Sequence, residues 1–580
     1  MKKLKYSGLM LAIVLGAINA SALVAPDNMI EAPQPDGSTV LIRQTGDAFN
    51  HKVYSADGYL LTVDADGYYV FAGLDDSGQL CPTSIRAINV GQRSSLETEK
   101  IQALDRERIM SAMVEMQTKP GAKQRVLHTR GPGLSTTRFP SKGEGKSIVV
   151  LVEYADNSFT IPNPKEYYEE LLNGEDFSDN GAYGSVRKYF IDNSEGAFSP
   201  HFDVYGPVKL PREMKYYGQD GYWGTDENAY MMAVEACQLL DDEVDFSQYD
   251  YNDDGMIDNV YIFYAGYGQQ DSGIANAVWP HSWDIDYGTF ATYFFDGVRL
   301  NHYACSNELR KKDNKPDGIG PFCHEFSHVM GLPDLYQTDT TLGAAYTPES
   351  WSIIASGSYN NMSRTPAGYS GYERYALDWI EPDTFVEEGE YILPSLQSSN
   401  KAFLVQTSKE NEYFIIENRQ REGWDSFLPG HGLLVWHIDF DLDVWDYNEV
   451  NNNPKHQRVD IVEADPSSTT HAKDCFPGRS NITSFTSTGK PAFVDWSGKP
   501  VGIDITDIKE LENGDVSFNV SFVQEAGVHV IDKDFVSGDC TVYNLTGTRL
   551  GLFKELDKTV LTPGIYIVVS ASGESRKIRL

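Results

Sequence analysis

The segment GPFCHEFSHVMGLPDLY (residues 320–336) constrains the fold more than any other part of the chain, because it predicts a helix with a defined polar face. Pro321 suits the first turn of an α-helix, where its missing amide hydrogen costs no hydrogen bond. His324 and His328 are four residues apart, so both imidazoles project from the same side of this helix. We therefore expect a short helix that presents two histidines to one point in space.

The exit of this helix is marked by Gly331 and Pro333. Glycine can adopt the left-handed conformation that ends a helix, and proline keeps the preceding Leu332 from continuing it. The chain can therefore turn back towards the histidines, and the next side chain able to bind a metal is Asp334. Glu349, about twenty residues past the second histidine, is the alternative third ligand.

These residues form the pattern HExxHxxGxxD, which is typical of a catalytic zinc site. Such a site uses three protein ligands and keeps its fourth position for water, so we expect ligands at His324, His328 and Asp334. Glu325 can take the proton of a zinc-activated water and pass it to a leaving amine. A solvated polar helix face, or a fold that has lost catalysis, are the alternatives. Cys323 is expected to be a packed thiol rather than a ligand.

A secretory signal peptide is predicted at residues 1–22. Lysines at positions 2, 3 and 5 precede a short apolar run, and the sequence Ala-Ser-Ala at 20–22 supplies a cleavage signal. No later stretch is long and apolar enough to span a bilayer. We expect a secreted, extracellular protein without a membrane span, with the cell surface of a Gram-negative bacterium as an alternative location.

The net charge of -36 over 580 residues restricts the partners. It argues against nucleic acid or an anionic membrane as the main partner. The length predicts about three or four domains. Six cysteines are sparse for an exported chain of this size, so we expect mostly buried thiols. We expect a monomer that acts on protein or peptide substrates.

Residues 23–117 are expected to form a β-rich domain with one helix. Three Asp-Gly pairs, at 36–37, 57–58 and 66–67, precede β-rich runs and predict hairpins. Ser94 and Glu97 form a capping-box pattern that opens a helix ending near Met116.

Residues 118–145 read as a linker rich in Gly, Pro, Ser and Thr. An activating trypsin-like protease could cut at Arg125, Arg130 or Arg138, which makes this a processing segment. The alternative is a simple tether whose charges are incidental.

Residues 146–382 alternate strands with helices around the zinc pattern, so we expect the catalytic domain there. Short alternating runs predict a β-sandwich over 383–525. Residues 526–580 read as a small separate β module. The fold class is therefore α+β, with an N-terminal β-rich domain and C-terminal all-β domains.

The stretch DYNDDGMID spaces oxygen ligands as a calcium loop does, with a glycine at the sharp turn. Tyr261 stands at the twelfth position in place of the usual glutamate, and a strand follows, so this is not an EF-hand. A hydrated Asp/Asn turn is the alternative to structural calcium. The candidate ligands are Asp250, Asn252, Asp254, the carbonyl of Met256, and Asp258.

Several stretches besides the zinc pattern resemble the immune inhibitor A family of secreted metallopeptidases, relatives of the metzincins. They are GSVRKYFIDNSEGAFSPHFDVYGPV, ESWSIIASGSYNN, PAGYSGYERYALDWI and YFIIENRQREGWDSFLPGHGLLVWHID. The resemblance covers residues 30 to 525. It implies a metzincin-like zincin catalytic domain, zinc bound by His324, His328 and Asp334, and Glu325 as the base.

The resemblance also places Ile354 where such enzymes have the methionine of the Met-turn, as an apolar floor beneath the metal. It implies that the N-terminal region is a propeptide, in which Cys81 or a nearby aspartate could occupy the fourth zinc position. His281 is expected to be a hydrogen-bonded core residue. Tyr359 is a candidate for stabilising an oxyanion.

Residues 526–580 resemble the C-terminal sorting domains of type IX secretion, with a plain β accessory module as the alternative. Together these features predict a secreted zinc endopeptidase made as a latent zymogen. The rival is a secreted binding or adhesion protein that uses an inactive zincin scaffold to engage host glycans or proteins. Glu325 separates the two, because an inactive scaffold need not keep a base beside its metal ligands. A zinc amidase acting on non-protein substrates is a third hypothesis.

Overall fold

The structure is a computed structural model that describes residues 21–26, 28–75, 77–117, 139–221, 225–339 and 341–523, with short segments at 528–529, 541–544, 549–552, 565–569 and 575–579. It is 22% helical and 30% strand, which confirms the mixed α+β class. Most of the predicted signal peptide, residues 118–138 of the predicted linker, and Cys540 lie outside the described residues. No helix in the described part is long and apolar enough to cross a membrane.

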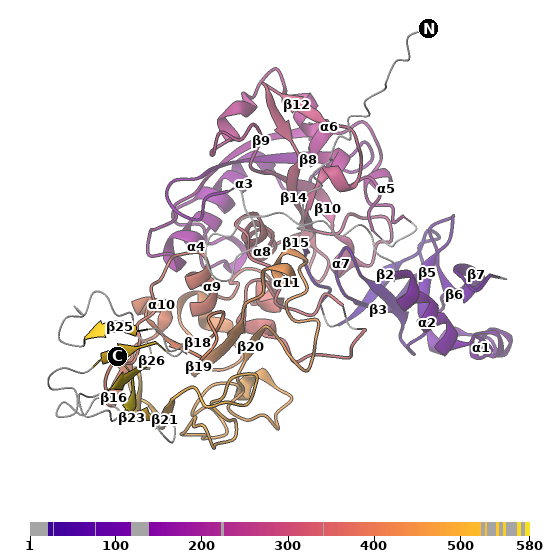
Figure 1. Cartoon of the computed structure of the whole chain (residues 1–580). Coiled ribbons are helices and arrows are strands. Elements are labelled where there is room, and N and C mark those ends of the chain that lie inside the picture. The colour runs from indigo at the N-terminus through magenta and orange to yellow at the C-terminus, as the bar shows by residue number, and fades with distance from the viewer. Residues whose placement is uncertain are drawn as a thin grey trace, which may run out of the picture.

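The catalytic region is built on a mainly parallel sheet in the order β1-β11-β14-β10-β8-β9, with β15 also paired to β14 (Figure 1). Strands β8, β9, β10 and β14 are parallel, whereas β11 runs antiparallel to β14 and β1 runs antiparallel to β11. The strands are β1 (Ser21–Ala22), β8 (Lys146–Glu153), β9 (His201–Lys209), β10 (Val260–Tyr267), β11 (His281–Asp284), β14 (His302–Arg310) and β15 (Lys315–Pro316).

Both faces of this sheet are buried, as the continuous apolar run of β8 requires. Because side chains alternate along a strand, Val149 and Leu151 enter one core and Ile148 and Val150 the other. Helices α3 (Pro164–Asn173), α4 (Val186–Asn193) and α8 (Gly320–Val329) are among those that contribute to the first core. Helix α6 (Tyr230–Leu240) contributes to the second core, on the opposite face.

The N-terminal region folds as a six-stranded antiparallel sheet in sequential order, covered by two helices. The three predicted Asp-Gly pairs form tight turns in it, with positive φ at Gly37, Gly58 and Gly67. The capping box of Ser94 and Glu97 is present. The elements are β2 (Met29–Pro33), β3 (Thr39–Thr45), β4 (Lys52–Ser55), β5 (Leu60–Val63), β6 (Tyr69–Leu74), β7 (Leu80–Arg86), α1 (Ser95–Gln102) and α2 (Arg106–Gln117).

The single helix expected from Ser94 to about Met116 is two helices. Helix α1 ends at Gln102, and the chain leaves helical geometry before Asp105, whose side chain accepts a hydrogen bond from the Arg108 amide (3.1 Å). Aspartate at that position caps the second helix, a local signal that the apolar periodicity did not carry.

The region after residue 382 consists mainly of strands, with two sheets packed around one apolar core and two short helices, α10 (Leu396–Ser399) and α11 (Leu442–Asp446). One sheet contains β17 (Ala402–Gln406), β18 (Glu412–Arg419), β19 (Gly432–Asp439) and β20 (Val459–Ile461). The other contains β16 (Gly389–Leu393), β21 (Ile503–Glu510) and β22 (Val516–Phe522). The opposite side of β18 and β19 joins the catalytic core, so these two regions share buried surface.

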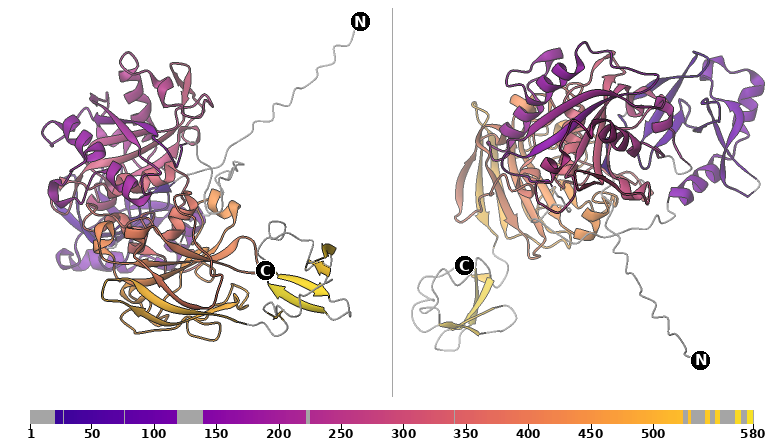
Figure 2. Two further views of the ribbon diagram at one scale, coloured as in Figure 1. Left: turned by 90° about the vertical axis from the view of Figure 1, so that its left-hand side faces the viewer. Right: turned by 90° about the horizontal axis from the view of Figure 1, so that it is seen from above.

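Strands β23 (Val528–His529), β24 (Thr541–Tyr543), β25 (Arg549–Leu552), β26 (Ile565–Val569) and β27 (Ser575–Arg579) form one further sheet. Both views of Figure 2 show these strands set apart from the rest of the molecule.

Candidate metal centre

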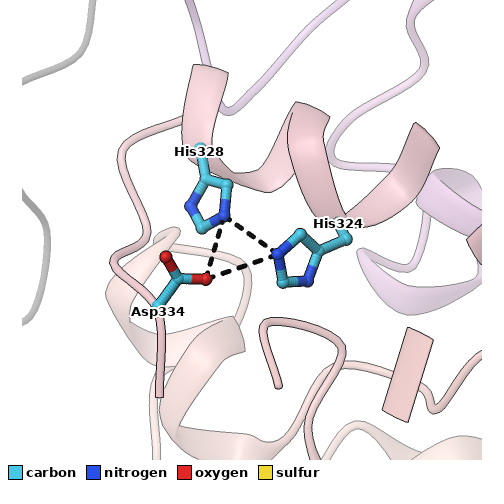
Figure 3. Close-up of side chains that lie close together, drawn as sticks. All are labelled: His324, His328 and Asp334. Carbon is cyan, nitrogen blue, oxygen red and sulfur yellow. Dashed lines mark hydrogen bonds and ion pairs between the residues drawn. The ribbon is translucent and has the colours of Figure 1, made fainter. Parts of the chain in front are cut away.

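One face of helix α8 packs in the apolar core, and the opposite face carries the two histidines. Phe322 and Phe326 are one turn apart and pack on the sheet, where the Phe322 ring lies 4.1 Å from the ring of Tyr261. His324 and His328 are each two residues further on, about 200° around the helix, so they project from the opposite side. The predicted helix is therefore present, and Figure 3 shows the two histidines that project from it towards Asp334.

The exit of α8 has the hydrogen bonds of a Schellman motif, which Gly331 makes possible with a φ of 100°. The Gly331 amide donates to the His328 carbonyl (2.8 Å), and the Leu332 amide donates to the Ser327 carbonyl (3.0 Å). The chain then reverses, and Asp334 comes to lie beside both histidines. The role expected of Gly331 is therefore the one it has.

His324, His328 and Asp334 bring three donor atoms together, as Figure 3 shows. The two Nε2 atoms are 3.2 Å apart, and Asp334 Oδ1 lies 3.3 Å from His324 Nε2 and 3.2 Å from His328 Nε2. Among the described residues, this is the one group of three His, Cys, Asp or Glu side chains with such spacing. Cys81, on β7, and Glu349, which bonds Thr347 and Ser356, lie outside it.

Both histidines are oriented by main-chain carbonyl groups. His324 Nδ1 lies 2.8 Å from the Ile353 oxygen, and His328 Nδ1 lies 2.7 Å from the Leu332 oxygen. A carbonyl oxygen only accepts, so each Nδ1 carries the hydrogen and each neutral Nε2 presents a lone pair to the group. The turn at Gly331 thus places the Leu332 carbonyl where it can orient the His328 ring.

This donor set fits a zinc ion. Three lone pairs converge in a fully buried space, and Asp334 Oδ1 has no hydrogen-bond partner within the described structure. Tetrahedral zinc with ligands at 2.0–2.1 Å separates its ligand atoms by about 3.4 Å, close to the spacings here. Burial would raise the pKa of Asp334, but the neighbouring His328 and His324 hold it well below its usual value. Burial lowers the pKa of His324, which favours the neutral ligand form.

Asp334 is itself held at both ends by Asn448, a residue that the sequence did not point to. The Asn448 side chain donates to Asp334 Oδ2 (2.6 Å) and accepts from the Asp334 amide (2.7 Å). It follows helix α11 (Leu442–Asp446) of the C-terminal β region. That region therefore takes part in building the site.

Glu325 is fully buried next to the group, and neither carboxylate oxygen has a hydrogen-bond partner among the described residues. Burial raises its pKa well above the usual value, and the charge of Asp334 adds to this effect. An unpaired buried carboxyl beside a metal-binding group can accept or donate a proton at the reacting atoms.

The weaker candidates are also placed. Ile354 is fully buried and its carbonyl accepts from the Leu335 amide (2.9 Å), while the preceding carbonyl orients His324. Cys323 is buried in the apolar core with a raised pKa, as expected of a packed thiol. His281 is buried, with Nε2 2.7 Å from the Tyr303 hydroxyl, and burial lowers its pKa to about 4.

The candidate calcium ligands lie in the turn before β10, which is exposed at residues 251–255 and buried at Asp258, with Gly255 at positive φ. The Asp250 carboxylate accepts from the amides of Asp254 (3.0 Å) and Gly255 (2.8 Å), and Asp258 Oδ2 accepts from the Tyr251 amide (2.9 Å). The acidic side chains of this turn do not bring three ligand atoms as close together as His324, His328 and Asp334 do.

Residues 141–381, which contain the whole cluster, match the catalytic domain of immune inhibitor A peptidase M6. Over 266 residues the chain is 27% identical to "Immune inhibitor A" of Bacillus thuringiensis subsp. alesti, covering 39% of this chain and 38% of that protein. Over 247 residues it is 28% identical to "Pre-pro-metalloprotease PrtV" of Vibrio cholerae serotype O1, covering 36% of this chain and 26% of that protein.

These similarities confirm the resemblance to the immune inhibitor A family. Residues 141–381 are therefore similar to a metallopeptidase catalytic domain, a class that implies a bound metal and protein substrates. The similarity of residues 526–580 to secretion-sorting domains, and the metzincin-like detail of the fold, stay predictions.

Proposed function

We propose that this protein is a secreted zinc endopeptidase, made as a latent zymogen. The observation that carries the proposal is the convergence of His324 Nε2, His328 Nε2 and Asp334 Oδ1 beside the unpaired carboxyl of Glu325. The three ligands fix a metal at one point, and Glu325 supplies a proton acceptor next to it. A solvated polar helix face would not bury three acceptor atoms against one another, because burying unpaired polar groups is costly.

The chain's own residues define the remaining chemistry. When bound, zinc makes water a nucleophile near neutral pH and polarises the scissile carbonyl. Glu325 takes the proton released by that water and delivers it to the leaving amide nitrogen. The carbonyls of Ile353 and Leu332 hold the two imidazoles, and Asn448 holds the aspartate, so that the ligands do not rotate away.

Latency is supported by the packing of the N-terminal domain on the catalytic region. The Tyr69 hydroxyl donates to the Gly273 carbonyl (3.1 Å), and the His51 ring stacks on Trp279 at 4.9 Å. The name of the Vibrio relative describes a pre-pro protein. We propose the same order here: export, then removal of residues up to the segment 118–145 by an activating protease.

The test is hydrolysis of casein or gelatin by processed protein, comparing wild type with Glu325→Ala and with chelator-treated enzyme. We expect cleavage to be lost on both treatments and restored in the wild type by zinc. Cleavage that survives both would rule out the peptidase function. Retained zinc binding without cleavage of any protein, in the wild type, would favour the binding-protein or amidase hypothesis.

We also propose structural calcium in the turn at residues 250–258, which the spacing of its oxygen groups supports. Thermal unfolding should shift to higher temperature with calcium, and Asp250→Asn should abolish the shift. Asp253→Asn, between two ligand positions, is the matched control and should keep it. A wild type that does not respond to calcium would contradict this site.

A further inference from the structure

Asp220 and Asp226 lie directly opposite each other in an antiparallel bridge of the catalytic region. The residues on either side are joined by main-chain hydrogen bonds, from the Glu227 amide to the Gln219 carbonyl (3.0 Å) and from the Gly221 amide to the Thr225 carbonyl (2.8 Å). The two aspartates are therefore a non-hydrogen-bonded pair, whose side chains project from the same side with Cβ atoms about 4.5–5.5 Å apart. Like charges placed opposite each other in this way are destabilising.

Each of the two carboxylates has one oxygen in contact with a donor and one without. Asp226 Oδ2 accepts from the Trp279 amide (3.0 Å). Asp220 Oδ2 lies 3.3 Å from Gln269 Nε2 and 3.5 Å from His51 Nε2. Oδ1 of each aspartate is shielded from solvent and has no hydrogen-bond partner in the described part of the chain.

Gln269, the first residue of helix α7 (Gln269–Ser272), adds a third oxygen of this kind. The residue is 2% exposed, and the bond from its Nε2 to Asp220 directs its amide group at the pair. Oε1 of the same amide is also shielded from solvent and unpartnered among the described residues. A buried oxygen that has given up water without gaining a donor costs free energy, so three such atoms together indicate a missing ligand.

The charges of the pair point to a positive ligand. Burial raises the pKa of Asp226 well above its usual value, and the negative charge of Asp220 raises it further. His51 contacts Oδ2 of Asp220, which leaves both Oδ1 atoms without a positive partner there. Buried charges in proteins are paired or coordinate metals, and a cation would allow both aspartates to ionise.

A pocket of about 340 Å³ lies beside Asp220 and gives access to the pair. Lys215, Gln219 and Asn276 line it from the catalytic region, and residues 63–67 line it from the N-terminal region. Water in a pocket of this size can supply further ligands to a cation held by the aspartates.

We propose that Asp220 Oδ1, Asp226 Oδ1 and Gln269 Oε1 bind a calcium ion, with water from the pocket completing its coordination. Calcium takes six to eight oxygen ligands in flexible geometry, and carboxylates, amide carbonyls and water are its usual set. The ion joins the bridge to helix α7 and, through the Trp279 amide, to the segment before β11. This second calcium site is separate from the turn at 250–258 and does not depend on the proposed peptidase function.

The first experiment uses terbium, an ion that replaces calcium and emits when a nearby indole transfers energy to it. The Trp279 ring stacks on His51 at 4.9 Å, so its indole lies beside the site. The probe is Tb³⁺ added to the zinc-loaded full chain carrying Asp250→Asn, which disables the turn at 250–258. Exciting tryptophan alone should give saturable emission that calcium displaces.

Two further substitutions in this chain locate the emission. Asp226→Asn should weaken Tb³⁺ binding by about tenfold or more, because ligand charge sets affinity. Glu227→Gln removes one charge from the next residue, which is exposed, and is the matched control that should leave binding unchanged. Gln269→Met removes the amide oxygen without a change of charge and should weaken binding several-fold.

Thermal unfolding of the same chains separates a metal ligand from a structural acid. Without calcium, Asp226→Asn should unfold at the same temperature as its parent or higher, because it relieves repulsion and its amide oxygen still accepts from Trp279. With calcium, the parent should gain stability and Asp226→Asn should not.

Three results would overturn the site. They are the absence of tryptophan-excited emission in the Asp250→Asn chain, equal Tb³⁺ affinity with and without Asp226→Asn, and an unfolding temperature that Asp226→Asn lowers equally with and without calcium. Equal affinity in Gln269→Met would overturn the proposed ligand set.

Discussion

The Asp334 carboxylate depends on a residue 114 positions away in the sequence. Asn448 donates to one of its oxygens and accepts from its amide, which leaves the other oxygen directed at the histidines. Because ligand orientation sets metal affinity, a partner of this kind contributes to binding without touching the metal.

We therefore expect Asn448→Ala to weaken zinc binding by about 10- to 100-fold. Competition with a chelator of known affinity measures this. Asn452→Ala is the control, since that side chain accepts from the Asp339 amide (2.8 Å) and serves the neighbouring loop. Equal zinc affinity in Asn448→Ala and wild type would show that the asparagine does not orient the ligand.

At this scale, the sequence was informative wherever the chemistry is local. The histidine pair, Glu325 and the turn to Asp334 all lie within one segment, and the structure brings them together. Asn448 could not be found in this way, because an asparagine carries no pattern of its own. Its role arises from packing between segments distant in the chain.

The helix exit at Gly331 is the element on which the site depends. With a φ of 100°, the residue lies where a side chain is strained, and its turn positions both Asp334 and the Leu332 carbonyl. Gly343 has nearly the same φ, 102°, and its nearest neighbour to a new Cβ is 4.0 Å away. The two glycines thus share the backbone strain but not the site.

We expect Gly331→Ala and Gly343→Ala each to lower the free energy of unfolding by about 1–2 kcal/mol. Only Gly331→Ala should also reduce zinc affinity, because only that turn holds a ligand. Chemical denaturation and zinc titration on both variants measure the two effects. Unchanged zinc affinity in Gly331→Ala would contradict the role assigned to the turn.

Helix α7 (Gln269–Ser272) contains a half-buried acid, Asp271, that makes stability depend on pH. Burial and the charge of Asp317 raise the pKa of Asp271 to about 7, although Asp271 accepts from the Lys311 amide (2.7 Å) and Arg310 is nearby. The folded state therefore holds a proton that the unfolded state releases near pH 4. Its contribution to stability is complete below that pH and is lost as the pH rises through about 7.

Asp271→Asn removes this titration. Between pH 4.5 and 7, the stability of the variant relative to wild type should rise, by at most about 1.4 kcal/mol per pH unit. Denaturation curves at both pH values test this. A stability difference that does not change with pH would show that Asp271 is ionised in the folded protein.

Local sequence patterns predicted the types of the helices and strands better than they predicted where these elements begin and end. Helix α8 occurs where Pro321 and the spacing of His324 and His328 indicated a helix. The helix break before Asp105 was missed because a capping aspartate competes with the helical periodicity around it. The pairing of β1 with β11 had no signal in the sequence. Strand β1 has only two residues, and it pairs with a strand about 260 positions further along the chain.

At the scale of the whole molecule, three regions meet at one site. The N-terminal region supplies Asp47, which accepts from the Tyr336 hydroxyl; the catalytic region supplies helix α8, and the C-terminal β region supplies Asn448. Burial and the charge of Asp334 raise the pKa of Asp47 to about 6, which reflects how closely the first region approaches the ligands. Sequence composition could divide the chain into regions. It could not show that these regions contribute residues to the same metal-binding site.

Activation by proteolysis should begin between the first two regions. We expect limited trypsin digestion to cut first after Arg125, Arg130 or Arg138, and to give a large fragment starting between residues 126 and 139. N-terminal sequencing of that fragment, with peptidase assays over the time course, should show activity rising as it forms. First cuts within residues 139–523 would contradict the processing role of this segment.

The most direct test of the zinc centre is anomalous diffraction at the zinc absorption edge from crystals of the zinc-loaded protein. The account predicts one strong peak about 2.0–2.2 Å from His324 Nε2, His328 Nε2 and an oxygen of Asp334. A peak with Glu349 in place of Asp334, or no peak between the two histidines, would contradict it.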